Sequence, residues 1–113
     1  MFSAGEIVIA SFPFTSLTSV KRRPCVILAV CDVSDDFVVA FMTSNPAVGQ
    51  LPSTTLLTPQ HPQWSRSGLK VPSGVRADRL ATLNITVISG AIGRLPPDIL
   101  ADVRGKLKKL LGL

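Results

Sequence analysis

Short apolar runs separated by polar turns dominate the chain before Leu95. Three of them have the length and β-branched content of strands: Glu6–Phe12, Pro24–Val30 and Phe37–Thr43. Runs of this length, bounded by turn-forming residues, are typical of β-strands. The turn-like segment Asp32–Asp36 separates the second run from the third, so we expect these two to form a hairpin. The unbroken apolar character of Pro24–Val30 predicts a strand covered on both faces.

The later strand signals are weaker and alternate with loops. In chain order we expect a polar loop at Pro13–Lys21, a loop at Ser44–Pro52, a short edge strand at Thr54–Leu57, a loop at Thr58–Ser67, strand-like pieces within Leu69–Leu83 broken by Pro72, Ser73 and Gly74, and a last strand from Thr86–Ser89 and Ala91–Ile92 interrupted by glycines.

After Leu95 the apolar spacing becomes helical. Pro96 and Pro97 suit the first turn of a helix, where backbone N–H groups have no partner, and Asp98 adds a favourable negative charge there. An apolar stripe at helical spacing follows, made of Ile99, Leu100, Val103, Leu107, Leu110 and Leu111. We therefore predict a terminal amphipathic helix, weakened by about 1 kcal/mol at Gly105.

These elements predict a mainly β fold in one domain covering residues 1–113. Several short strands and one terminal helix favour a small, strongly bent barrel or a sandwich, with the helix over one opening or face. Apolar residues make up 46% of the chain, which is high for a small monomer and hints at a buried subunit interface. Apolar runs are far shorter than the roughly 20 residues of a membrane span, and the first basic residue is Lys21, so we expect a cytoplasmic protein rather than a membrane or secreted one.

The charge balance favours an anionic partner. Twelve Lys and Arg against seven Asp and Glu give a net charge of +5, a sign that suits nucleic acid. Four basic residues lie in the last ten positions, where they can simply complement the end of the helix. The consecutive Lys21, Arg22 and Arg23 form either a binding site or an ordinary solvated loop.

The residue types exclude several kinds of site. The chain has one His, His61, and scattered carboxylates, so we expect no metal site and no Ser-His-Asp triad. It has no phosphate-binding loop of the GxxxxGK[ST] type. Cys25 and Cys31 fit neither a redox pair nor a zinc motif, and we expect both to be buried free thiols.

What remains is chemistry based on Arg, Asp and Thr. Arg76 and Asp78 are two residues apart, which on a strand puts them on the same face. An Arg there can bind a phosphate and an Asp can accept a proton, but the same pair also fits a structural ion pair. If the predicted hairpin forms, Arg23 and Thr43 meet at one end of the sheet, where guanidinium and hydroxyl suit a phosphate. A loop Arg and a strand-end Thr without a role is the alternative.

Several segments resemble the MazF/PemK family of toxin endoribonucleases in the same order along the chain. They are GEIVIASFPFTSLTSVKRRPCVILAV, FMTSN, SGVRADRLATL, ISGAIGRL and the terminal amphipathic helix. The resemblance implies an SH3-like barrel with a C-terminal helix that acts as a homodimer. It also implies metal-independent cleavage of single-stranded RNA by attack of the 2′-hydroxyl, with no cofactor, and a cognate antitoxin whose flexible segment occupies the RNA groove.

The resemblance also assigns roles to residues. Arg23 matches the catalytic Arg of an R-P motif, and Thr43 matches a phosphate-binding Thr or Ser. Arg76 and Asp78 match an Arg-x-Asp pair of the PemK-like branch, in which the Asp is the base and the Arg the acid. The candidates for substrate binding are Lys21, Arg22, Ser44, Ser73 and Arg79.

The first loop departs from the family pattern, because TSLTSVK contains neither the Glu that many members carry there nor the His found in some PemK-like members. Lys21 and Arg22 can compensate by gripping backbone phosphates. With no Tyr in the chain, base stacking would use Phe, Trp64 or Arg. A non-catalytic SH3-like module that binds RNA or protein therefore stays open as an alternative, as does a purely structural subunit.

Overall fold

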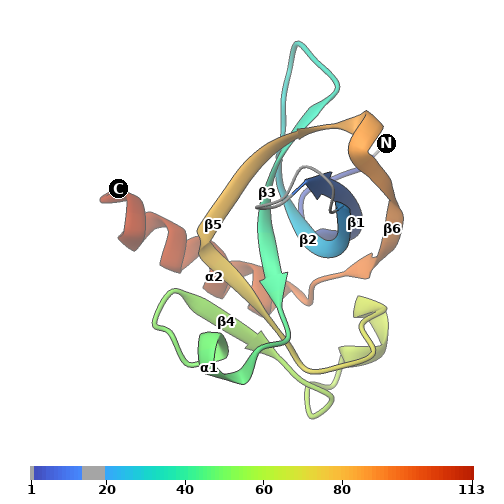
Figure 1. Cartoon of the computed structure of the whole chain (residues 1–113). Coiled ribbons are helices and arrows are strands. Elements are labelled where there is room, and N and C mark those ends of the chain that lie inside the picture. The colour runs from blue at the N-terminus through green and yellow to red at the C-terminus, as the bar shows by residue number, and fades with distance from the viewer. Residues whose placement is uncertain (1, 14–19) are drawn as a thin grey trace.

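One six-stranded antiparallel sheet forms the framework of the protein (Figure 1). The structure, a computed structural model, describes residues 2–13 and 20–113. The strands lie in the order β4-β5-β3-β2-β1-β6. Their bounds are β1 Glu6–Pro13, β2 Val20–Val30, β3 Asp36–Thr43, β4 Thr54–Leu57, β5 Ser73–Asn84 and β6 Ile88–Arg94.

The short helix α1 (Pro46–Gly49), the 3₁₀ turns η1 (Trp64–Ser67) and η2 (Ile85–Val87), and the C-terminal helix α2 (Pro97–Leu111) complete the fold. The predicted mainly β fold with a terminal helix is confirmed. The sheet coils strongly, as Figure 1 shows, but its outer strands β4 and β6 do not pair with each other, so it is an open sheet rather than a closed barrel.

The predicted hairpin between the second and third strands is confirmed by the antiparallel pairing of β2 with β3. Strand β2 begins earlier than predicted, because Arg22 and Arg23 pair with Ser11 and Ala10 of β1. The basic run therefore lies on a strand and not in a loop. The side chain of Lys21 lies outside the described residues.

Two later predictions were wrong in detail. β5 runs unbroken from Ser73 to Asn84, because pairing with β3 on one side and β4 on the other stabilises a strand that its own residues signal weakly. The last strand starts at Ile88 and not at Thr86, because Thr86 lies in the turn η2. There the Thr86 N–H group donates a hydrogen bond to the Asn84 side-chain oxygen.

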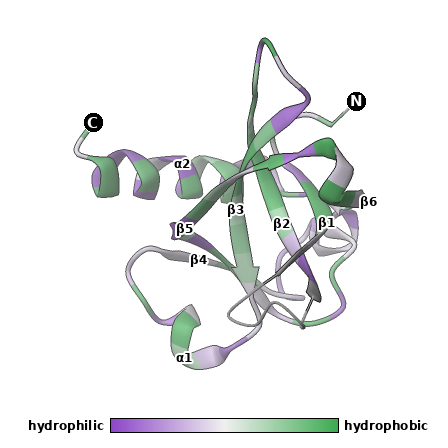
Figure 2. Ribbon diagram, turned by 45° about the horizontal axis from the view of Figure 1, so that its top comes forward, coloured by the Kyte–Doolittle hydropathy of each residue, from purple (hydrophilic) through white to green (hydrophobic). Residues whose placement is uncertain are grey.

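The sheet separates two apolar clusters. Val26 belongs to the cluster beneath α2 and Ile27 to the cluster on the other face, and both are fully buried. The prediction that this part of β2 is covered on both faces is therefore confirmed, although Ala29 and Val30 are exposed. Figure 2 shows the apolar residues gathered on the central strands β2 and β3.

Helix α2 packs its first three turns against β4 and β5. Val103 is fully buried, and Leu100 and Leu107 pack around the same cluster. The predicted terminal helix is confirmed through Leu111, but Leu110 and Leu111 are 50% and 57% exposed, so the apolar stripe continues past the part of α2 that packs against the sheet. The last turns extend beyond the sheet (Figure 1), which leaves these side chains with nothing to cover them inside the described chain.

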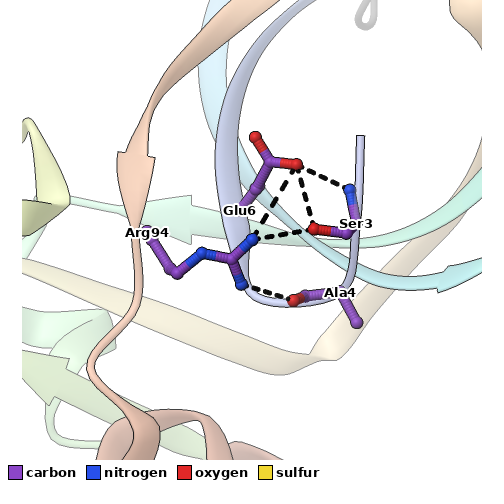
Figure 3. A network of polar contacts seen from close by, with 4 residues as sticks. All are labelled: Ser3, Ala4, Glu6 and Arg94. Carbon is purple, nitrogen blue, oxygen red and sulfur yellow. Dashed lines mark hydrogen bonds and ion pairs between the residues drawn. The ribbon is translucent and has the colours of Figure 1, made fainter. Parts of the chain in front are cut away.

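Two polar networks fasten the ends of the chain to the sheet. Arg94, at the end of β6, donates hydrogen bonds to the Ala4 carbonyl (2.9 Å) and the Ser3 hydroxyl (2.7 Å) and lies 4.0 Å from Glu6 (Figure 3). On α2, Lys106 donates to the Thr54 carbonyl of β4 at 2.7 Å. These contacts hold the N-terminal turn and the terminal helix in place.

The segment after β4 returns across β6. Its turn η1 approaches the β6 backbone so closely that a Cβ atom at Gly68 or at Gly93 would collide with backbone atoms of the opposite segment. Earlier in the same segment, the His61 ring donates from Nε2 to Asp98 at the start of α2, at 2.9 and 3.0 Å from the two carboxylate oxygens. The segment is thus held against both β6 and α2.

The thiols differ in environment. Cys25 is fully buried, and this burial raises the pKa of its thiol to about 12. Cys31 is only half-buried, so the prediction of two buried thiols was wrong for this residue, which follows the end of β2. Among the described residues, no helix is long and apolar enough to cross a membrane.

Candidate functional site

A cleft of about 800 Å³ opens where β2 starts and β3 ends. The β2–β3 register pairs Cys25 with Phe41, and continuing it by two residues sets Arg23 opposite Thr43. Arg23, Thr43 and Arg76 line this cleft from three neighbouring strands, β2, β3 and β5. We call it the main cleft.

The Thr43 hydroxyl is held by the turn that follows β3. Its oxygen accepts a hydrogen bond from the Asn45 N–H group at 3.1 Å, which leaves the hydroxyl hydrogen able to point toward a ligand. Asn45 in turn caps α1 by accepting from the Ala47 N–H group at 3.0 Å. Ser44 lies between them and also lines the main cleft.

Arg76 and Asp78 form a bidentate pair on β5. Arg76 donates from Nε at 3.0 Å and from one terminal nitrogen at 2.7 Å to the two carboxylate oxygens. The hydrogen bond from Arg76 lowers the pKa of Asp78, and the same bond raises the pKa of Arg76. The same-face prediction is confirmed. The second terminal nitrogen of Arg76 is not used by this pair, and Arg76 lines the main cleft whereas Asp78 does not.

The candidates for substrate binding lie in different surroundings. Ser73 is buried at the cleft wall, where its hydroxyl donates to the Val71 carbonyl at 2.9 Å. Arg79 lines an adjoining hollow of about 400 Å³ together with Arg23, Thr43 and Arg76. Arg22 is exposed on β2 and lines neither space.

Two polar side chains that line the main cleft, Lys70 and Asn45, were not predicted from the sequence. Lys70 comes from the segment that crosses β6, and its position beside β2 and β3 follows only from the tertiary fold. Asn45 carried a local signal, since an Asn before a Pro is a helix N-cap pattern.

The main cleft is positively charged. Arg23, Lys70 and Arg76 line it, and no Asp or Glu does so within the described part of the chain. Concave walls of one charge sign concentrate ligands of the opposite sign. Among residues 2–13 and 20–113, no group of three His, Cys, Asp or Glu side chains is arranged to hold a metal ion. The cleft therefore suits a phosphodiester bound by guanidinium and hydroxyl groups.

Comparison with known proteins gives a consistent result. Residues 3–111 match the family described as PemK-like, MazF-like toxin of type II toxin–antitoxin system. The solved structure of MazF from Deinococcus radiodurans is 30% identical, with a TM-score of 0.74 over 97% of this chain and 96% of that one. No curated protein matches the chain by sequence.

Two complexes are also similar. The MazE–MazF structure from Deinococcus radiodurans is 28% identical, with a TM-score of 0.75 over 97% of this chain and 95% of that chain. An endoribonuclease in complex with its cognate antitoxin, from a mycobacterial species, is 18% identical, with a TM-score of 0.71 over 97% and 94%. At that identity the likeness shows the fold alone.

Proposed function

The chain belongs to the PemK-like, MazF-like toxin family of type II toxin–antitoxin systems, and from this premise we propose that it is a metal-independent endoribonuclease for single-stranded RNA. One observation carries the proposal. Arg23, Thr43 and Arg76 line one positively charged cleft from three adjacent strands. Sheet hydrogen bonds fix such strands relative to one another, so the groups are positioned before RNA binds.

In the proposed reaction the RNA supplies its own nucleophile. The 2′-oxygen forms a bond to the adjacent phosphorus while the bond from phosphorus to the 5′-oxygen breaks. One proton leaves the 2′-hydroxyl and one is gained by the 5′-oxygen, so the products are a 2′,3′-cyclic phosphate and a 5′-hydroxyl. Negative charge grows on the phosphate oxygens, where fixed cations and hydroxyl donors stabilise the transition state most.

We assign Arg23 and Thr43 to the phosphate. The Arg23 guanidinium would stabilise the charged phosphorane and assist proton transfer, and the Thr43 hydroxyl would donate to a phosphate oxygen. Arg76 would offer the terminal nitrogen that Asp78 does not bind. The Arg76 guanidinium binds both carboxylate oxygens of Asp78, and we propose that Asp78 positions Arg76. The family resemblance implied instead that Asp78 is the base, and the cleavage rate of the Asp78→Asn variant would test that role.

Flanking phosphates and nucleotides would contact the remaining candidates. Arg22, Lys21 and Arg79 would add ionic contacts, each of which makes binding more dependent on salt. Ser44 offers a hydroxyl at the cleft wall. Ser73 is placed to accept rather than donate, because its own hydrogen already binds Val71.

The family membership extends the proposal to partners. We propose a cognate antitoxin that covers the cleft and a homodimer as the active form, as well as a cytoplasmic location where messenger RNA is available. The complexes of similar toxins with antitoxins support the first of these.

Mapping the ends of cut RNA tests the function. The purified protein is incubated with single-stranded RNA in EDTA, and we expect 2′,3′-cyclic phosphate and 5′-hydroxyl ends. Arg23→Ala should lower the cleavage rate at least a hundredfold, the scale seen when one charge-stabilising donor is removed. Arg104→Ala, which removes an equal charge from an exposed position on α2, is the matched control and should cut normally. Intact RNA of varied sequence with folded wild-type protein would refute the proposal.

The non-catalytic SH3-like module is the second candidate, favoured by the first loop without Glu or His. It predicts salt-dependent RNA binding with no cut ends. The same assay therefore separates the two.

A further inference from the structure

A smaller pocket of about 250 Å³ opens from the wall of the main cleft. The two spaces share Thr43, Ser44, Asn45 and Ser73. We call the smaller one the side pocket. Thr43 thus lines both spaces, so RNA bound at its hydroxyl group has the side pocket directly beside it.

The side pocket has apolar walls. Pro46, Leu56 and Pro72 line it, and Gly49 and Gly74 keep it open, because no side chain projects from them. Leu56 is 52% exposed although it lies on a strand, so its apolar surface is offered to a ligand rather than to the core. Pockets for drug-sized molecules start at roughly 300 Å³, so this one suits a single flat ring system.

The rim carries amide groups that can read a polar edge. The side-chain amide of Gln50, which follows α1, makes no hydrogen bond within the described part of the chain. It presents a donor and an acceptor side by side. The Asn45 side-chain oxygen accepts a hydrogen bond from the Ala47 N–H group, so the NH₂ group of Asn45 is a second donor for a ligand.

From these observations we infer that the side pocket is a nucleobase subsite, in which a base next to the scissile phosphate inserts between apolar walls and Gln50 reads its hydrogen-bonding edge. This inference rests on the proposed function. Unstacked bases of single-stranded RNA are recognised in this way, by contact on their faces and hydrogen bonds on their edges. Gln50 is accordingly a specificity-determining residue and takes no part in bond making or breaking.

The test uses RNA with a randomised stretch, with cut sites mapped for the wild type, Gln50→Ala and Gln50→Glu. The wild type should prefer a base at one fixed position beside the cut. Gln50→Ala should weaken that preference roughly ten- to a hundredfold while the other positions keep theirs. In Gln50→Glu the side chain is a carboxylate that only accepts hydrogen bonds, so the preference should change toward bases that offer N–H donors. Gln60→Ala removes the same group from an exposed position outside the side pocket and should behave as the wild type.

A binding arm separates this inference from the ribonuclease itself. Oligonucleotides with a 2′-deoxy group at the scissile nucleotide cannot be cut, and their dissociation constants are measured for each base at that neighbouring position. Cleavage by all variants with unchanged preferences would overturn the subsite and leave the ribonuclease intact. Loss of preference at every position would also overturn it, since a single base would not then be read. Base-selective binding lost in Gln50→Ala, without cleavage by the wild type, would support the subsite and refute the ribonuclease.

Discussion

Gly93→Ala should loosen the contact between β6 and the segment that crosses it. A Cβ atom at Gly93 would lie 2.5 Å from the Arg66 carbonyl oxygen and closer still to the Ser67 carbonyl group. Those neighbours are backbone atoms of η1, so no side chain can turn away. The two segments must separate by roughly 1 Å to restore ordinary contact between heavy atoms.

The expected loss of stability follows from what the separation disturbs. Ser67 is fully buried, and its hydroxyl donates to the Trp64 carbonyl at 2.6 Å, while Trp64 packs against the cluster beneath α2. Overpacking of this kind costs about 1–3 kcal/mol, or a fall in melting temperature of about 4–12 °C for a domain of this size. Cleavage should also slow, because the same segment carries Lys70 into the main cleft.

Thermal unfolding followed by circular dichroism measures the effect, and other glycines supply the controls. Gly90, on the same strand, has nothing within 4 Å of its would-be Cβ, and Gly90→Ala should change stability by less than about 1 kcal/mol. Gly105→Ala should stabilise α2 by about 1 kcal/mol. If the melting temperature of Gly93→Ala equals or exceeds that of the wild type while these controls behave as stated, the close approach of η1 to β6 does not constrain the fold.

Further predictions concern thiols and carboxylates. At pH 8 the native protein should react with a thiol reagent at Cys31 only, and Cys25, whose pKa burial raises to about 12, should react only after unfolding; two fast thiols in the native protein would contradict this. Asp102→Ala should cost about 1–3 kcal/mol in urea unfolding, because it strands the buried Thr55 hydroxyl that donates to it at 2.7 Å. The hydrogen bond from Thr55, and next that from Lys106, lower the pKa of Asp102, so its contribution is complete above the ordinary carboxyl pKa of roughly 4 and is lost as the pH falls through the lower folded value. Asp102→Asn should flatten that acid limb, and an unchanged limb would speak against the linkage.

The sequence predicted the elements whose signals are local. The apolar runs that became β1, β2 and β3 and the helical spacing of α2 depend on near neighbours, and the hairpin follows from a short turn. From that hairpin alone, Arg23 and Thr43 could be placed at the same end of the sheet. The same-face spacing of an Arg and an Asp on a strand was equally readable.

Other features depend on partners distant in the chain. The continuity of β5 through Ser73 and Gly74 comes from the strands on both sides of it, which no local pattern reveals. The entry of Lys70 into the main cleft requires the crossing segment to return over β6. The exposure of Leu110 and Leu111 could not be predicted either, because their apolar spacing is helical like that of the buried residues, and only the tertiary fold shows that the sheet does not reach them.

The contacts that cover the outer strands, β4 and β6, bear on whether the protein aggregates by pairing strands between molecules. The ammonium of Lys106 occupies the outward-facing carbonyl of Thr54, and on the far side the Trp64–Gly68 segment lies against the backbone of β6. An uncovered ladder invites a stray strand to extend it, the first step of ordered aggregation. The Lys106 ammonium at Thr54 and the Trp64–Gly68 segment at β6 therefore each protect part of an outer strand, which leaves fewer backbone groups for a stray strand to pair with.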